Sequence, residues 1–118
     1  MEEQISWLLE LAVNPGQLES LKALISEMVE SSEAELGTVS YEWFISEDER
    51  LVYNCDRYVD SRAVTTHLAT FGEKFAPRFL AAVSPTRLTV FGNPNAEVRE
   101  ALAGFGPTYL ECLDGFRR

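Results

Sequence analysis

The 118-residue chain is poor in basic residues. Ten lysines and arginines stand against nineteen aspartates and glutamates, which gives a formal net charge of −9 at pH 7. Proteins that bind nucleic acid obtain most of their affinity from basic side chains that displace counterions from the phosphates. Since the basic residues form no cluster along the sequence, we do not expect nucleic acid as a partner.

The chain also lacks long hydrophobic runs and has few cysteines. No apolar run approaches the ~20 residues of a membrane helix, and the acidic start with Glu2 and Glu3 is unlike a secretory signal. The cysteines, Cys55 and Cys112, allow one disulfide at most and, with a single histidine, supply too few ligands for a zinc site. We therefore expect a cytoplasmic protein with reduced thiols, no membrane segment and no metal.

Hydrophobic residues make up 46% of the chain and aromatic residues 11%, as is typical of a folded protein. The length corresponds to one domain. A chain this short buries roughly two thirds of the surface that its unfolded form exposes. Association with a second copy would therefore stabilise it.

The first third of the sequence predicts a strand and a helix. Alternation places apolar side chains on both faces of a strand over residues 5–13. Asn14 is then a candidate N-cap, with Pro15 at the first helical position. Apolar residues at steps of three and four from Leu18 to Val29 predict an amphipathic helix, which we expect Gly37 to end.

The middle of the chain predicts a hairpin, two helices and a further strand. Strands over residues 39–45 and 51–58 flank a short charged turn. Ser61 or Asp60 can cap a helix over residues 62–71, which Gly72 interrupts. A short helix begins near Pro77 and ends at Pro85, before a strand over residues 86–92.

This order of elements, βαββαβ, predicts an α+β ferredoxin-like fold with an antiparallel sheet. Such a sheet carries its helices on one face only, yet the predicted strands place large apolar groups on both faces. The simplest cover for the second face is the same sheet of another copy, related by a two-fold axis. We therefore predict a homodimer.

The fold accounts for residues 1–93 and leaves a C-terminal extension over residues 94–118. We expect a short helix over residues 96–103 with Val98 and Leu102 inward, a turn over 104–107 and an extended segment over 108–113. The extension contains several large apolar side chains: Phe105, Tyr109, Leu110, Leu113 and Phe116. It is too apolar for a solvated tail, so we expect it to pack on the domain or across the dimer.

Three short motifs resemble one known family when they are taken in this order. They are Asn-Pro-Gly at residues 14–16 before a long helix, Gly-Thr-Val-Ser-Tyr-Glu at 37–42, and Tyr-Val-Asp-Ser-Arg-Ala at 58–63 leading to His67 and Leu68. Over residues 5–92 the chain resembles the antibiotic biosynthesis monooxygenase family of dimeric α/β barrels. Members of known activity oxidise phenolic or hydroquinone-like substrates with O2, without metal or flavin, and others degrade haem. The resemblance implies a cofactor-independent monooxygenase acting on a small aromatic or quinol-like molecule.

Such a reaction needs a base, because triplet oxygen reacts slowly with closed-shell molecules and an anion supplies an electron far better than its neutral acid. His67 is the candidate, since a free imidazole titrates near neutral pH. On a helix it shares a face with Val64 and Phe71, the face that we expect to meet the sheet. The alternative is a hydrogen-bonded structural histidine.

Further candidates lie on the two central strands. Asn54 can hydrogen-bond a substrate carbonyl or a developing oxyanion, and Tyr41, Trp43, Tyr58 and Phe71 can surround a flat ring. The alternative for the aromatic row is core or dimer interface, and we expect Trp7 at the interface. Glu42 and Asp56 can form a carboxylate pair across adjacent strands. Cys55 alternates with Asn54 and so lies on the opposite face.

Three other functions remain open at this stage. A small-molecule binding protein of the same fold would bind without turnover. An interaction module would dock a partner through the apolar extension. A haem-degrading enzyme would need His67 as an iron ligand, and no further haem-site residues accompany it.

Overall fold

The computed structural model describes residues 4–118, so Glu2 and Glu3 of the acidic start lie outside it. The strands are β1 (Ile5–Val13), β2 (Thr38–Ile45), β3 (Leu51–Tyr58), β4 (Val83–Phe91) and β5 (Thr108–Leu110). The α-helices are α1 (Leu18–Glu33), α2 (Ser61–Lys74), α3 (Ala76–Ala82) and α4 (Ala96–Leu102), followed by a 3-10 turn, η1 (Ala103–Phe105). The strands form one sheet in the order β2-β3-β1-β4-β5. Its pairs are antiparallel except for β4 and β5, which run parallel.

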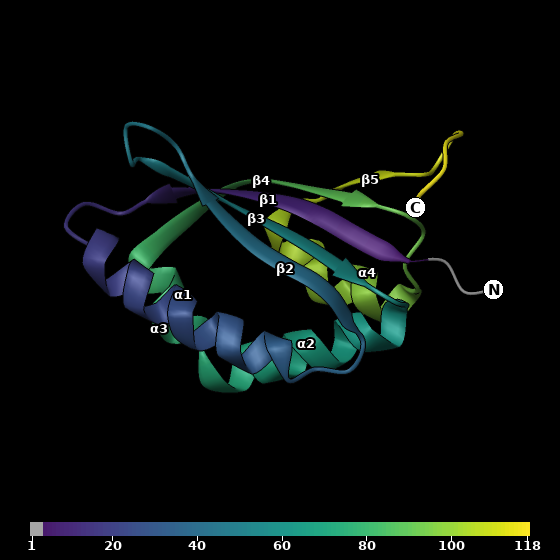
Figure 1. Ribbon diagram of the computed structural model, residues 1–118, viewed down its shortest axis with the longest axis horizontal. Helices are drawn as coiled ribbons and strands as arrows, with labels where there is room; N and C mark the ends of the chain where they lie inside the picture. Colours follow the sequence, from purple (N-terminus) through teal and green to yellow (C-terminus); the bar gives the residue numbers. More distant parts are fainter. Residues whose placement is uncertain (1–3) are drawn as a thin grey trace.

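All four α-helices lie on one side of the sheet, and among residues 4–118 no helix covers the other side (Figure 1). This arrangement confirms the predicted α+β ferredoxin-like fold. Alternate residues of the central strand β1, Ile5, Trp7, Leu9 and Leu11, are buried beneath the helices.

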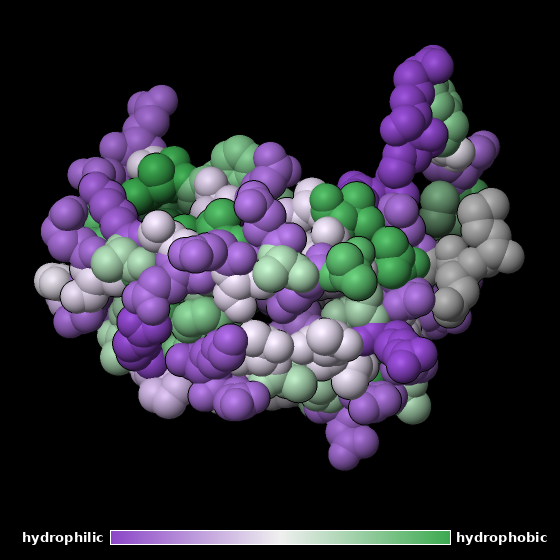
Figure 2. Space-filling view, turned by 60° about the horizontal axis from the view of Figure 1, so that its bottom comes forward, coloured by the Kyte–Doolittle hydropathy of each residue, from purple (hydrophilic) through white to green (hydrophobic). Residues whose placement is uncertain are grey.

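Helix α1 buries the apolar stripe that its sequence predicts, through Leu21, Leu24 and Met28. The side of the molecule that carries the helices is largely hydrophilic, with separate hydrophobic patches (Figure 2). No helix among residues 4–118 is long and apolar enough to cross a membrane.

The prediction that Asn14 caps the first helix is wrong. Helix α1 begins at Leu18, and its N-cap is Gln17, which makes no side-chain capping bond. The Asn14 amide instead ties the end of β1 to the junction of α3 and β4: Nδ2 donates to the carbonyl of Ala81 over 3.0 Å, and Oδ1 accepts from the hydroxyl of Ser84 over 2.7 Å. Contacts distant in sequence thus compete successfully with the local cap.

The predictions that Gly37 and Gly72 end or interrupt helices are also wrong. Helix α1 ends at Glu33, before Gly37, and Gly37 instead lies where a Cβ would come within 2.5 Å of the Cβ of Ala63 on α2. Gly72 lies inside α2, which continues to Lys74. A glycine costs a helix only about 1 kcal/mol relative to alanine, so the packing of α2 on the sheet outweighs it.

The prediction that Pro85 separates a helix from a strand is wrong. Pro85 belongs to β4, which begins at Val83. Strand β4 pairs with β1 along its length, whereas β5 pairs with it only at residues 89–91. Pro85 therefore lies where one edge of β4 has no neighbouring strand, which is where a residue without an N–H is tolerated.

Only part of the C-terminal extension packs on the domain of its own chain: α4 and β5 do, whereas Leu113 and Phe116, which we expected to be covered, are 99% and 80% exposed. Helix α4 buries Val98 and Leu102, as predicted. Strand β5 ends at Leu110 and is shorter than the extended segment predicted over residues 108–113. The division of the chain into residues 1–93 and 94–118 stays a prediction.

Candidate functional site

A cavity of about 280 Å³ lies between the helix-covered face of the sheet and helices α2, α3 and α4. Strands β1 to β4, these three helices and η1 all contribute lining side chains. Most of the lining is aromatic or aliphatic. Apart from the Tyr41 hydroxyl and the indole N–H groups of Trp7 and Trp43, the polar groups of the lining belong to Asn54, Asp56 and His67.

The period of a strand brings two of these polar groups into the cavity. Asn54 and Asp56 are two residues apart on β3, so both side chains point to the helix-covered face. His67 reaches the same space from α2, whose start is fixed by Asp60, because the Asp60 carboxylate accepts from the backbone N–H of Ala63 over 2.9 Å. The exposed fractions of Asn54, Asp56 and His67 are 4%, 3% and 8%.

Glu35 orients His67 from outside the cavity. The His67 Nδ1 and Glu35 Oε1 atoms are 2.9 Å apart, and the hydroxyl of Thr38 donates to the same oxygen over 2.6 Å. Burial raises the pKa of Glu35, but the hydrogen bonds from His67 and Thr38 outweigh it, so the pKa is lowered overall. An ionised Glu35 only accepts hydrogen bonds. The proton of a neutral His67 is therefore assigned to Nδ1, which leaves Nε2 as an acceptor.

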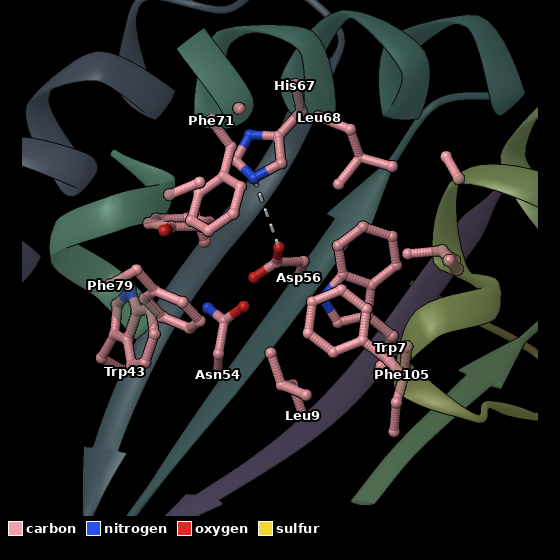
Figure 3. A pocket seen from close by; sticks show the side chains of 16 residues that line it. Trp7, Leu9, Trp43, Asn54, Asp56, His67, Leu68, Phe71, Phe79 and Phe105 are labelled. Atoms are coloured by element: carbon pink, nitrogen blue, oxygen red, sulfur yellow. Dashed lines mark ion pairs between the residues drawn. The ribbon is translucent and has the colours of Figure 1, made fainter. Parts of the chain in front are cut away.

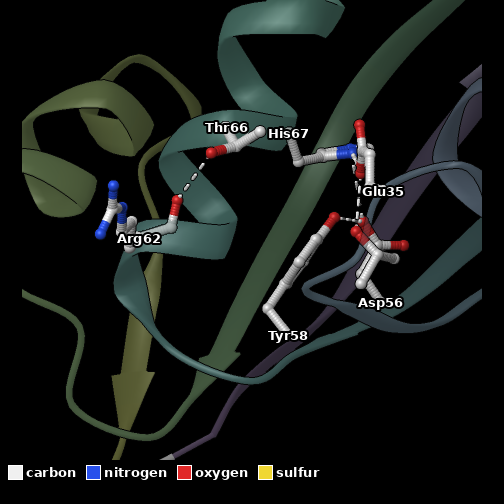
Figure 4. Close-up of polar contacts among 7 residues, drawn as sticks. Glu35, Asp56, Tyr58, Arg62, Thr66 and His67 are labelled. Atoms are coloured by element: carbon white, nitrogen blue, oxygen red, sulfur yellow. Dashed lines mark hydrogen bonds and ion pairs between the residues drawn. The ribbon is translucent and has the colours of Figure 1, made fainter.

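Asp56 faces the other nitrogen of His67 (Figure 4). Its Oδ2 lies 3.9 Å from His67 Nε2 and accepts a 2.6 Å hydrogen bond from the hydroxyl of Tyr58. Its Oδ1 is buried and has no hydrogen-bond partner among residues 4–118. Burial outweighs the Tyr58 hydrogen bond and raises the pKa of Asp56 to about 7. The site thus holds a carboxyl group that gains and loses its proton near neutral pH.

Aromatic side chains flank these polar groups on two sides. Trp7 and Phe105 lie on one side of Asp56, and Trp43, Phe71 and Phe79 lie on the other (Figure 3). The indole nitrogens of Trp7 and Trp43 are buried and, within the described part of the chain, have no acceptor. Two side chains of the cavity lining therefore carry unpaired N–H donors.

Five of the six predicted site residues line this cavity: Tyr41, Trp43, Asn54, His67 and Phe71. The sixth, Tyr58, does not. Its ring is fully buried, 5.0 Å from that of Trp7 and 5.2 Å from that of His67 between ring centroids. Tyr58 thus acts on the cavity through its hydrogen bond to Asp56.

Two predictions about neighbouring residues are wrong. Trp7 is not on the open face of the sheet, where a second copy would lie: it is 5% exposed and lines the cavity. Glu42 does not pair with Asp56, because it lies opposite Cys55 in the register and is exposed on the other face. Cys55 lies on that face, as predicted.

Sequence reasoning missed the roles of Asp56, Trp7 and Glu35. The two-residue spacing from Asn54 to Asp56, and from Trp7 to Leu9, is a signal that both members of each pair share a face. No such signal exists for Glu35. It follows α1 in an irregular segment and meets His67 across 32 residues of sequence.

The sequence matches the family model described as antibiotic biosynthesis monooxygenase over residues 5–84, which is more than half of the chain. The chain belongs to this family. No curated protein matches the sequence.

Solved structures with the same fold include MupZ from Pseudomonas fluorescens, with a TM-score of 0.88 and 21% sequence identity over 100% of this chain and 91% of that one. SnoaB from Streptomyces nogalater, described as a cofactor-independent oxygenase, matches with a TM-score of 0.67 and 14% identity over 80% of this chain and 96% of SnoaB. A protein from Bacteroides thetaiotaomicron, described as a possible oxidoreductase, has a TM-score of 0.63 and 19% identity over 77% of this chain and 98% of that protein. At these identities the likenesses show the fold.

Proposed function

We propose that this protein is a cofactor-independent monooxygenase that oxidises a small, flat aromatic or quinol-like molecule with O2. The observation that carries the proposal is the buried carboxyl of Asp56, with one free oxygen in an aromatic cavity and His67 beside it. Membership of the family and the fold shared with SnoaB support it.

The first step is the transfer of an acidic proton from the substrate to the Asp56–His67 pair. The Asp56 oxygen and His67 Nε2 are 3.9 Å apart, so the two groups face the same point of the cavity and can share the proton. The Nδ1–H of His67 keeps its hydrogen bond to Glu35. This bond holds the imidazole in place while Nε2 accepts the proton. The substrate anion that remains is stabilised by the unused N–H donors of Trp7 and Trp43 and by the amide of Asn54.

The anion then reduces O2 by one electron, and the substrate radical and superoxide combine to form a C–O bond. The resulting peroxide anion takes back the proton held by the Asp56–His67 pair. If the oxidised carbon carries a second hydrogen, loss of water leaves a new C=O group. One oxygen atom then ends in the product and the other in water. The apolar aromatic lining keeps bulk water from the anion during these steps.

We also propose that a second copy covers the open face of the sheet, as we expected from the sequence. The exposed apolar side chains on this face include Phe44, Phe91 and Leu110, whose exposed fractions are 53%, 42% and 46%. Light scattering at micromolar concentration should give the mass of two chains. A mass of one chain would refute this proposal.

The main test is oxygen uptake by metal-stripped, flavin-free protein with 1,8-dihydroxyanthrone and a panel of hydroquinones. We expect uptake that depends on pH around the Asp56 pKa of about 7, and strong loss of kcat in Asp56→Asn and His67→Gln. Cys112→Ser is a matched control, since Cys112 is exposed. Equal uptake by wild type and both site variants would refute the assigned chemistry.

Binding without oxygen uptake would instead favour the small-molecule binding protein. Both tryptophans of the chain line the cavity, so their fluorescence reports binding independently of turnover. We do not propose haem degradation, because Nδ1 of His67 bonds Glu35 and Nε2 faces Asp56.

A further inference from the structure

We propose that the C-terminal segment of residues 95–110 is the specificity-determining wall of the cavity and forms one side of its entrance. The family model ends at residue 84, yet Ala101, Leu102 and Phe105 line the cavity. These residues belong to α4 and η1. The inference rests on the proposed function only for the chemical nature of the ligand. The effect of the wall on ligand size does not depend on whether the ligand is oxidised.

Contacts at both ends hold this segment against the domain. At its start, the backbone N–H of Asn95 donates to the hydroxyl of Ser61 over 3.0 Å, and the Asn95 side chain caps α4 by accepting from the N–H of Val98 over 3.0 Å. At its end, the N–H of Gly92 donates to the carbonyl of Leu110 over 2.8 Å, where β5 pairs with β4. The segment is therefore a fixed wall.

Arg99 adds a brace that joins the segment to the residues just before it. Its guanidinium lies 4.1 Å from the centre of the Tyr109 ring and donates to the carbonyl of Pro94 over 3.0 Å and to the Asn93 side chain over 2.9 Å. The brace links α4 to β5 across the turn that carries Phe105. The position of Phe105 in the cavity wall is thus set by the segment itself.

The entrance is marked by lining residues that are also exposed. Gly72 on α2 and Ala101 on α4 both line the cavity and are both exposed to solvent. A Cβ built on Gly72 meets no atom within 4 Å. We infer that these small residues on the two helices leave the opening through which a ligand enters. Phe105, which is half-buried, lines the same cavity.

Two substitutions in the segment should change ligand size preference in opposite directions. Ala101→Phe narrows the entrance from an exposed helix position and so should not disturb folding. Phe105→Ala removes a ring from the wall. In hydrophobic pockets, changes of this size alter discrimination by about tenfold or more.

The experiment measures the quenching of tryptophan fluorescence by 1-naphthol, which has two rings, and by 1,8-dihydroxyanthrone, which has three. We expect Ala101→Phe to weaken binding of the three-ring probe about tenfold relative to binding of the two-ring probe. Phe105→Ala should shift this ratio of affinities in the opposite direction. Phe116→Ala is the matched control, since Phe116 is 80% exposed. An unchanged ratio of affinities in both variants would overturn the inference.

A second measurement needs no ligand. Acrylamide, a small neutral quencher, should reach Trp7 and Trp43 more easily in Phe105→Ala and less easily in Ala101→Phe. Equal quenching in wild type and both variants would overturn the inference even if neither probe binds. Failure of the proposed function looks different, since the wild type would then take up no oxygen while the size and quenching effects persisted.

Discussion

Replacement of Asp56 by asparagine should remove a pH dependence from the stability of the folded protein. The carboxyl is 3% exposed, and burial is the main cause that raises its pKa to about 7. Asparagine has nearly the same shape, and its amide oxygen can accept the hydrogen bond of the Tyr58 hydroxyl. The substitution therefore removes the ionisation and keeps the hydrogen bond.

The direction of the effect follows from proton binding. Between the ordinary aspartate pKa of 3.8, which applies to the unfolded chain, and the folded value of about 7, the unfolded chain has lost the Asp56 proton and the folded chain still holds it. The stabilisation from this group is therefore complete at low pH and is lost as the pH rises toward 7. At about 1.4 kcal/mol per pH unit, the loss between pH 4.5 and 8 amounts to about 3 kcal/mol.

Guanidinium unfolding of wild type and Asp56→Asn at a series of pH values measures this difference. The free energy of unfolding of the variant minus that of wild type should rise by about 3 kcal/mol from pH 4.5 to 8. Asp48→Asn is a flat control: the Ser46 hydroxyl and the backbone N–H of Arg50 lower the pKa of Asp48, so this carboxylate is ionised in both the folded and the unfolded chain from pH 4.5 to 8 and its replacement should add no pH dependence there. If the curves of wild type and Asp56→Asn run parallel, Asp56 ionises like an ordinary aspartate and the assigned proton chemistry loses its basis.

Four further substitutions test other parts of the site and fold. Glu35→Gln should lower kcat by about tenfold or more with ligand affinity unchanged, because the His67 ring loses its orienting charge; oxygen uptake beside fluorescence titration checks this, and an unchanged kcat contradicts it. Gly72→Ala should stabilise the protein by about 0.5–1 kcal/mol in guanidinium unfolding, whereas Gly37→Ala, which meets α2 within 2.5 Å, should destabilise it by about 1–3 kcal/mol; equal effects would contradict the packing. Trp7→Phe keeps a ring but removes the N–H donor, so 1,8-dihydroxyanthrone should bind up to about tenfold more weakly; unchanged affinity would show that the donor is not used.

Regular patterns in the sequence were sufficient to predict the fold. The steps of three and four from Leu18 to Val29 and the alternation over β1, β2 and β3 reflect burial on one face, which the sequence records directly. The errors lie at helix and strand ends. Asn14, Gly72 and Pro85 have clear local preferences, and at each of them contacts with distant segments outweigh a preference of about 1 kcal/mol.

The site residues that could be predicted are those whose positions follow the regular spacing of a strand or a helix. Asn54 lies in the cavity because it shares a face of β3 with Val52, and His67 because it shares a face of α2 with Val64. Glu35 and Phe105 follow no period. Each reaches the site only because the chain folds a distant segment against α2 or the sheet, and the sequence contains no local record of that contact.

The pattern of unpaired polar atoms is a further argument that the cavity binds a ligand. Four buried side-chain atoms in the described part of the chain have no partner, and three of them belong to cavity residues: Trp7 Nε1, Trp43 Nε1 and Asp56 Oδ1. Each unpaired buried group costs about 1–3 kcal/mol, and native proteins keep few of them. A ligand that brings acceptor oxygens to the two indoles and a proton to the carboxyl would remove this cost on binding. The same groups therefore weaken the empty protein and define the chemistry of the molecule that fits it.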